Sequence, residues 1–323
     1  MIRDVILPDQ SRDDWPEIRA RIQKRVLQSM GDFPEPQESL DFEVLAEQSR
    51  DGLLIREFRF SPVPGVTTYG SLVKPPSGRA TGGGVLCMHG TDPRLAHRNV
   101  LSPDERPNRP YAIELAHRGV TTMAVDQFGF GEGNGDHTQQ EVVASFYRQY
   151  PNWSLDGVRL RVHQQAIDLF SQCAGADLGR IGCIGNSLGG RTAVYLAALD
   201  ERISACVAGA GVSPNITNVF RNPPQPPGLS PRLDEGIRKT GVPLFEYQEM
   251  LSLIAPRGVL LLEPWNDRYN PLVEPVLRCF EKARFVFQRC DAPEQIQILC
   301  HGDGHDTIPI VRQYAYDWLL QRL

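Results

Sequence analysis

Short, largely apolar runs recur along the chain after residue 84. Each run is followed by glycine or polar residues and then by a stretch with helical spacing. The runs are residues 85–88, 120–125, 180–184, 203–208, 259–262 and 296–299. Strands without polar alternation are covered on both faces, as in parallel sheets flanked by helices. The pattern therefore predicts an α/β fold with a mostly parallel sheet, whose catalytic core spans residues 81–323.

The first 80 residues follow two other patterns. Apolar residues spaced four apart predict an amphipathic helix over residues 14–30. That stripe consists of Ile18, Ile22, Val26 and Met30. Residues 42–74 alternate as half-exposed strands do, with a hairpin turn signal at Asp51-Gly52 and a break at Gly65. We expect residues 1–80 to form an N-terminal helix and antiparallel edge strands of the same domain.

The alternation of apolar runs and helical stretches is interrupted at residues 212–250. These residues include seven prolines and few periodic apolar residues. A stretch of this length between two sheet strands is usually either functional or disordered. We expect a lid or a wall of the substrate pocket. A surface excursion without a function is the alternative.

Charge and composition exclude several kinds of partner. The 34 basic and 39 acidic side chains give a net charge of -5, and no long run of Lys or Arg suggests nucleic acid. The first residues carry charges where a signal peptide needs an apolar core, and no apolar run reaches the roughly 18 residues of a membrane span. We expect a soluble, cytoplasmic protein with no membrane partner; its oligomeric state is not indicated.

The seven cysteines are an odd number, and four of them lie in apolar, strand-like runs. These four are Cys87, Cys183, Cys206 and Cys300. Reduced thiols in the core explain them better than a disulfide framework or a metal site.

The strongest chemical signal is a Gly-x-Ser-x-Gly motif formed by Gly185, Ser187 and Gly189. It stands between a predicted strand and a predicted helix, which is the context that this nucleophile motif requires. The serine must sit on a tight, strained turn, and glycines remove side chains that would clash there. Ser187 is therefore the predicted nucleophile, and a glycine-rich turn without chemistry is the alternative.

A serine hydroxyl needs a base that takes its proton and an acid that orients the base. His305 is the candidate base, because it follows the last apolar run between two flexible glycines. His301 is the rival. Asp267, in the loop after residues 259–262, is the candidate acid, with Glu263 as the alternative.

The acidic and histidine residues near the end of the chain also allow a metal cluster as a minor alternative. Those residues are His301, Asp303, His305 and Asp306. No further ligand group is indicated, so we expect no metal and no cofactor.

Acyl transfer also needs N–H donors for the oxygen on which charge develops. We assign one donor to the backbone of Leu188 and the second to Thr91, in the loop after residues 85–88. His89-Gly90 at this strand end could otherwise be a simple turn.

Two further segments are candidates for ligand binding. Residues 126–135 are rich in glycine but lack the ending of a nucleotide-binding loop, so a tight loop explains them better. A cationic group follows the 85–88 run and could bind an acidic substrate group, although a solvated loop is the plainer interpretation. The group consists of Arg94, His97, Arg98, Arg106 and Arg109.

Together these pieces resemble the α/β-hydrolase superfamily, in particular its dienelactone-hydrolase-like and bacterial acetyl-xylan-esterase-like branches. The matching pieces surround His89, Asp126, Ser187, Asp267 and His305 and cover roughly residues 80–323. The resemblance implies a cofactor-free hydrolase of small-molecule carboxylic esters, including acetyl groups on sugars. A peptidase or amidase like the prolyl-oligopeptidase relatives, or a catalytically silent binding protein of the same fold, are the alternatives.

Overall fold

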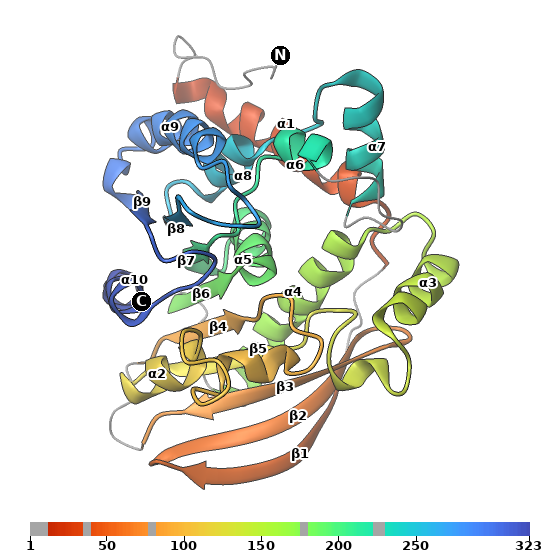
Figure 1. Ribbon diagram of the computed structural model, residues 1–323, viewed down its shortest axis with the longest axis vertical. Helices are drawn as coiled ribbons and strands as arrows, with labels where there is room; N and C mark the ends of the chain where they lie inside the picture. The colour runs from red at the N-terminus through yellow and green to blue at the C-terminus, as the bar shows by residue number, and fades with distance from the viewer. Residues whose placement is uncertain (1–11, 35–39, 77–81, 175–179, 222–229) are drawn as a thin grey trace.

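The computed structural model describes residues 12–34, 40–76, 82–174, 180–221 and 230–323 (Figure 1). Its strands form one sheet in the order β1-β2-β3-β5-β4-β6-β7-β8-β9. Their bounds are β1 Asp41–Arg50, β2 Leu53–Val63, β3 Val66–Lys74, β4 Gly84–Met88, β5 Thr121–Val125, β6 Ile181–Asn186, β7 Ile203–Gly209, β8 Gly258–Pro264 and β9 Ile296–His301. The helices are α1 Trp15–Met30, α2 Tyr111–His117, α3 Gln139–Gln149, α4 Leu155–Ala174, α5 Leu188–Leu199, α6 Asn215–Arg221, α7 Pro231–Thr240, α8 Tyr247–Ile254, α9 Glu274–Arg289 and α10 Pro309–Leu320.

The six strands from β4 to β9 pair in parallel and coincide with the six apolar runs. Nearly all residues of β4 to β8 are buried, as strands covered on both faces must be. The predicted α/β class with a mostly parallel sheet is confirmed. Ligands in such sheets bind beyond the carboxyl ends of the strands, so we expect the active site in the loops at that edge.

The N-terminal extension also has the predicted elements. Strands β1, β2 and β3 are antiparallel, and β3 joins them to β5 in the main sheet. Asp51, Gly52 and Gly65 have φ angles of 52°, 77° and 77°, as the tight turns between these strands require. Strand β1 is an exposed edge of the sheet, and the strands of the extension continue the core sheet.

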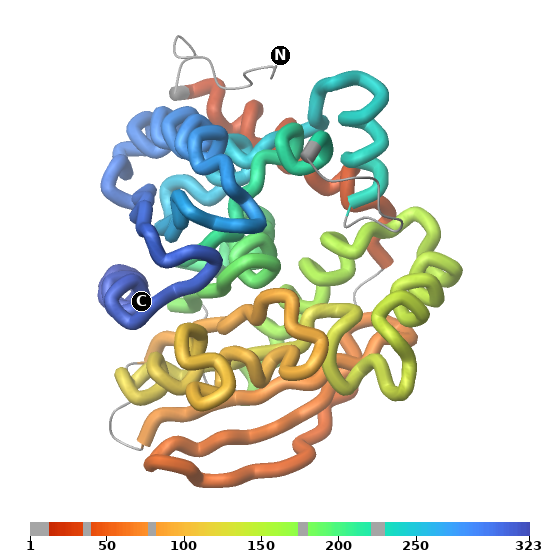
Figure 2. The backbone as a smooth tube through the Cα atoms, in the orientation of Figure 1, coloured from red at the N-terminus to blue at the C-terminus, as the bar shows by residue number. Residues whose placement is uncertain are grey.

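Two helical layers cover the sheet. Helices α2 and α10 bury their apolar residues against one face. Helices α4, α5, α8 and α9 cover the other face, and α1 packs outside them against α4, α7 and α8. The backbone trace shows how this first helix lies beside helices from the second half of the chain (Figure 2). None of the described helices combines the length and the apolar character needed to cross a bilayer.

The segment 212–250, of which residues 222–229 lie outside the described residues, contains more regular structure in its described parts than its composition suggests. It forms α6, α7 and the first half of α8, and every residue of α8 is buried. Asp156 of α4 anchors it, since it accepts a hydrogen bond from Ser230 at 2.6 Å and pairs with Arg191 at 2.7 Å. Arg191 in turn donates to the hydroxyl of Tyr247 at 2.9 Å. The end of the predicted insertion therefore belongs to the core layer, while its role as a lid stays a prediction.

Candidate active site

Ser187 occupies the turn between β6 and α5. Its φ and ψ angles are 60° and −123°, a conformation that a residue with a side chain rarely adopts and that costs about 1–3 kcal/mol. The backbone N–H donates to the carbonyl of Gly209 at 2.8 Å, which fixes the turn against β7. The residue is half-exposed although both neighbouring elements are buried. The sequence therefore places this hydroxyl at the carboxyl edge of the sheet, in a strained turn.

Both glycines of the motif are required by close backbone approach. A Cβ atom at Gly185 would lie 2.5 Å from the carbonyl carbon of Gly189. A Cβ atom at Gly189 would lie 2.2 Å from the carbonyl oxygen of Met88. The missing side chains therefore let α5 approach both β6 and β4, which brings the serine turn against the end of β4.

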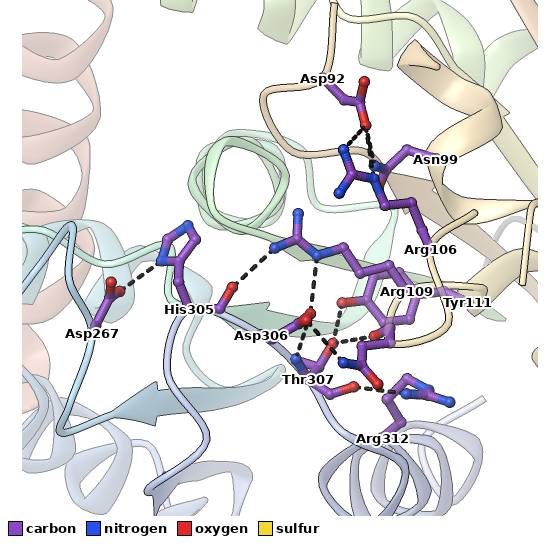
Figure 3. Close-up of polar contacts among 11 residues, drawn as sticks. Asp92, Asn99, Arg106, Arg109, Tyr111, Asp267, His305, Asp306, Thr307 and Arg312 are labelled. Atoms are coloured by element: carbon purple, nitrogen blue, oxygen red, sulfur yellow. Dashed lines mark hydrogen bonds and ion pairs between the residues drawn. The ribbon is translucent and has the colours of Figure 1, made fainter. Parts of the chain in front are cut away.

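His305 and Asp267 face each other across two loops (Figure 3). The Nδ1 atom of His305 lies 2.7 Å from Oδ2 of Asp267. The side chain of Asp267 is 1% exposed and that of His305 15%, so the acid is inside and the base reaches the surface. Oδ1 of the same carboxylate accepts the backbone N–H of Tyr269 at 2.7 Å. An imidazole held in this way carries its proton on Nδ1 and leaves Nε2 as a base.

Asn266 holds the histidine loop in place. Its side chain donates to the carbonyl of Gly302 at 2.7 Å and accepts the N–H of Gly304 at 2.9 Å. Gly304 has a φ of 68°, which lets the chain turn back toward the sheet. No sequence pattern indicates this clamp, because its two halves come from different loops.

The structure also places the rival residues. His301 is buried at the end of β9, with Nδ1 3.4 Å from Asp303, and burial lowers its pKa. Glu263 is buried in β8, and burial raises the pKa of its carboxyl well above the ordinary value. Among the hydrogen bonds of the described residues, none joins Glu263 to His305, and none joins Ser187 to His305. The structure thus brings Asp267 rather than Glu263 to the histidine.

The residues expected to supply the two N–H donors lie at the start of α5 and in the loop after β4. Leu188 is the first residue of α5, where backbone N–H groups have no acceptor within the helix. Thr91 is exposed in the loop after β4. Directly before it, Gly90 passes so close that an added Cβ would lie 3.5 Å from Cβ of Ser187. This loop therefore borders the position that an acyl group on the serine would occupy.

His89 and Gln127 fix the end of β4. The Nδ1 atom of His89 lies 2.7 Å from the carbonyl of Gly90 and must donate, while Nε2 accepts the backbone N–H of Gln127 at 2.8 Å. Burial lowers the pKa of His89 to about 4, which keeps this neutral tautomer at neutral pH. The Gln127 side chain donates to the carbonyl of His89 and accepts from Thr192 of α5. The glycine-rich loop thus supports the site, a role that its sequence did not reveal.

Within the described residues, no group of three or more His, Cys, Asp or Glu side chains is arranged to hold a metal ion. The side chains of the alternative metal cluster instead face different partners. His305 turns to Asp267, and His301 faces Asp303. Asp306 accepts hydrogen bonds from Asn108 and Arg109.

Comparisons with known proteins bear on the family and the fold. A model of the Abhydrolase family matches residues 4–290. A Bacillus subtilis (strain 168) protein named "Putative hydrolase YtaP" is 24% identical over 310 residues, which cover 94% of this chain and 99% of that protein. A glucuronoyl esterase structure from Solibacter usitatus has a TM-score of 0.79 at 12% identity and covers 100% of this chain and 97% of its own.

A second solved structure, described as "a putative acetyl xylan esterase" from Bacteroides fragilis NCTC 9343, has a TM-score of 0.69 at 17% identity. The match covers 93% of this chain and 78% of that one. At these identities the likeness is one of fold. Together with the family match, it confirms the α/β-hydrolase resemblance inferred from the sequence.

Proposed function

The chain belongs to the Abhydrolase family, and we propose that it is a serine hydrolase that cleaves carboxylic esters through an acyl-enzyme. Ser187 is the nucleophile, His305 the general base and Asp267 the residue that orients the base. The hydrogen bond between Nδ1 of His305 and Oδ2 of Asp267 carries the proposal, because it leaves Nε2 as the proton acceptor.

The reaction follows from these roles. The Oγ atom of Ser187 attacks the acyl carbon while Nε2 of His305 takes the hydroxyl proton. Asp267 stabilises the imidazolium, and the N–H groups of Leu188 and Thr91 stabilise the oxyanion. The imidazolium then gives its proton to the leaving alcohol, and an acyl-serine remains. Water, deprotonated by the same histidine, attacks the acyl carbon and releases the acid, which restores Ser187.

We further propose a small ester as the substrate, either a short-acyl ester or an acetylated carbohydrate. The fold is shared with a protein described as a glucuronoyl esterase and with one described as an acetyl xylan esterase, which supports this substrate class. The mechanism needs no cofactor.

The proposal is tested with p-nitrophenyl esters of increasing acyl length, followed by acetylated sugars, using the wild type and Ser187→Ala. We expect hydrolysis that falls with acyl length and is lost with the serine. A fluorophosphonate should label the wild type and not the variant. Full turnover by Ser187→Ala would refute the proposal.

The two alternatives give different results in the same assays. A peptidase or amidase would cleave aminoacyl amides and show negligible ester hydrolysis. A catalytically silent binding protein would hydrolyse neither kind of substrate and would fail to react with the fluorophosphonate.

A further inference from the structure

The cationic group after β4 divides into two parts in the structure. Four of its members pair with carboxylates of nearby loops, as a solvated or locally braced loop does. The pairs are Arg94 with Glu105, His97 with Asp126, Arg98 with Glu132 and Arg106 with Asp92. Arg109 differs, because it extends to the loop that carries His305 (Figure 3).

Two nitrogens of the Arg109 guanidinium are held by this loop. Its Nη2 atom donates to the backbone carbonyl of His305 at 2.9 Å, and its Nε atom donates to Asp306 at 3.2 Å. The Asp306 carboxylate also accepts from the side chain of Asn108 and from the N–H of Thr307. The orientation of the guanidinium is therefore fixed before any substrate arrives.

The third nitrogen, Nη1, lies near the turn of the nucleophile. A Cβ atom built at Gly90 would lie 3.2 Å from Nη1 of Arg109 and 3.5 Å from Cβ of Ser187, so both side chains approach the same glycine. In the described part of the chain, no hydrogen bond is recorded for Nη1. The arginine side chain is 16% exposed, so solvent reaches part of it. Unused guanidinium donors thus lie beside the serine on the side of the β4 loop.

We propose that Nη1 of Arg109 binds a carboxylate on the acyl part of the substrate, which makes the half-ester of a dicarboxylic acid a preferred substrate class. This inference rests on the proposed ester hydrolysis at Ser187. The acyl part is the part that stays attached to the serine, and Gly90 leads into the loop of the oxyanion donor. A fixed and partly desolvated guanidinium forms strong, directional hydrogen bonds to a carboxylate.

The test compares p-nitrophenyl butyrate with mono-p-nitrophenyl succinate, whose acyl groups have equal chain length. We expect the wild type to have a higher kcat/KM for the succinate, with the preference weakening as salt rises. Arg109→Gln should lower kcat/KM for the succinate about 10- to 100-fold more than for the butyrate, the worth of one charge-assisted hydrogen bond. Arg106→Gln is the matched control, since Arg106 binds Asp92, and should leave the ratio of the two esters unchanged.

Arg109 also positions the His305 loop, so an equal loss on both esters would mean positioning alone and would overturn the carboxylate site. No wild-type preference for the succinate would overturn it as well. Calorimetric titration of free succinate into Ser187→Ala provides a readout that needs no turnover. If the wild type hydrolysed neither ester but succinate binding depended on Arg109, the carboxylate site would stand and the proposed function would fall. If the wild type hydrolysed neither ester and succinate did not bind, both the carboxylate site and the proposed function would be refuted.

Discussion

The Nδ1 atom of His305 lies 2.7 Å from the Oδ2 atom of Asp267, although 38 residues separate them in the chain. The acid is buried and the imidazole reaches the surface. This pair fixes one tautomer, and the first prediction follows from it.

Asp267→Asn should lower kcat for p-nitrophenyl acetate by roughly 10³- to 10⁴-fold, because an amide favours the wrong tautomer of the histidine. Glu263→Gln is the control. Burial raises the pKa of Glu263 well above its usual range, which favours the neutral carboxyl that glutamine resembles. The kcat values of both variants, measured by steady-state kinetics, test this prediction. A larger loss in Glu263→Gln than in Asp267→Asn would exchange their roles.

Asn266→Ala should reduce kcat by about 10-fold or more, because the loop between Gly302 and Gly304 loses both of its side-chain hydrogen bonds. The thermal midpoint should change little, since Asn266 is exposed. Asn134→Ala removes a comparable hydrogen bond to Gly129 in another loop and should leave kcat nearly unaltered. Equal kcat values for Asn266→Ala and Asn134→Ala would contradict the role of Asn266 in holding the histidine loop.

Gly189→Ala should destabilise the protein by about 3 kcal/mol or more, since its Cβ would meet the carbonyl oxygen of Met88 at 2.2 Å. Gly236→Ala is the opposite case. It lies within α7, where a Cβ finds open space, and alanine should stabilise the helix by about 0.5–1 kcal/mol. Urea unfolding of both variants measures the difference. A Gly189→Ala protein as stable as the wild type would show that the turn has room.

Stability should fall as the pH drops from about 6.5 to 4, because burial lowers the pKa of both His89 and His163 to about 4. The unfolded chain binds protons at these histidines in this range and the folded protein does not, so the free energy of unfolding rises with pH there and levels off above it. At pH 5 the loss is about 2 kcal/mol per histidine.

Urea unfolding at pH 7 and pH 5 tests this dependence. His163→Gln should reduce the difference in unfolding free energy between the two pH values by about 2 kcal/mol, whereas His137→Gln, at an exposed position, should leave it unchanged. An unchanged difference between the two pH values in His163→Gln would argue against the buried histidine as its source.

Local patterns in the sequence were enough to predict the sheet and the tight turn at Ser187. A strand buried on both faces must be apolar throughout, so the runs that became β4 to β8 were visible without the tertiary structure. The turn at Ser187 needs glycines within two residues on each side, so its signal is also local. The helix α8 escaped notice because prolines dominate the stretch before it.

The tertiary structure alone decided how the loops meet at the carboxyl edge of the sheet. Sequence order allowed both Asp267 and Glu263, and only the folded loops bring Asp267 to His305. Gln127 reaches His89 across 38 residues, and Arg109 reaches the His305 loop across 196. Such contacts depend on the geometry of several loops at once, whereas strand burial and glycine turns are determined by neighbours in the chain.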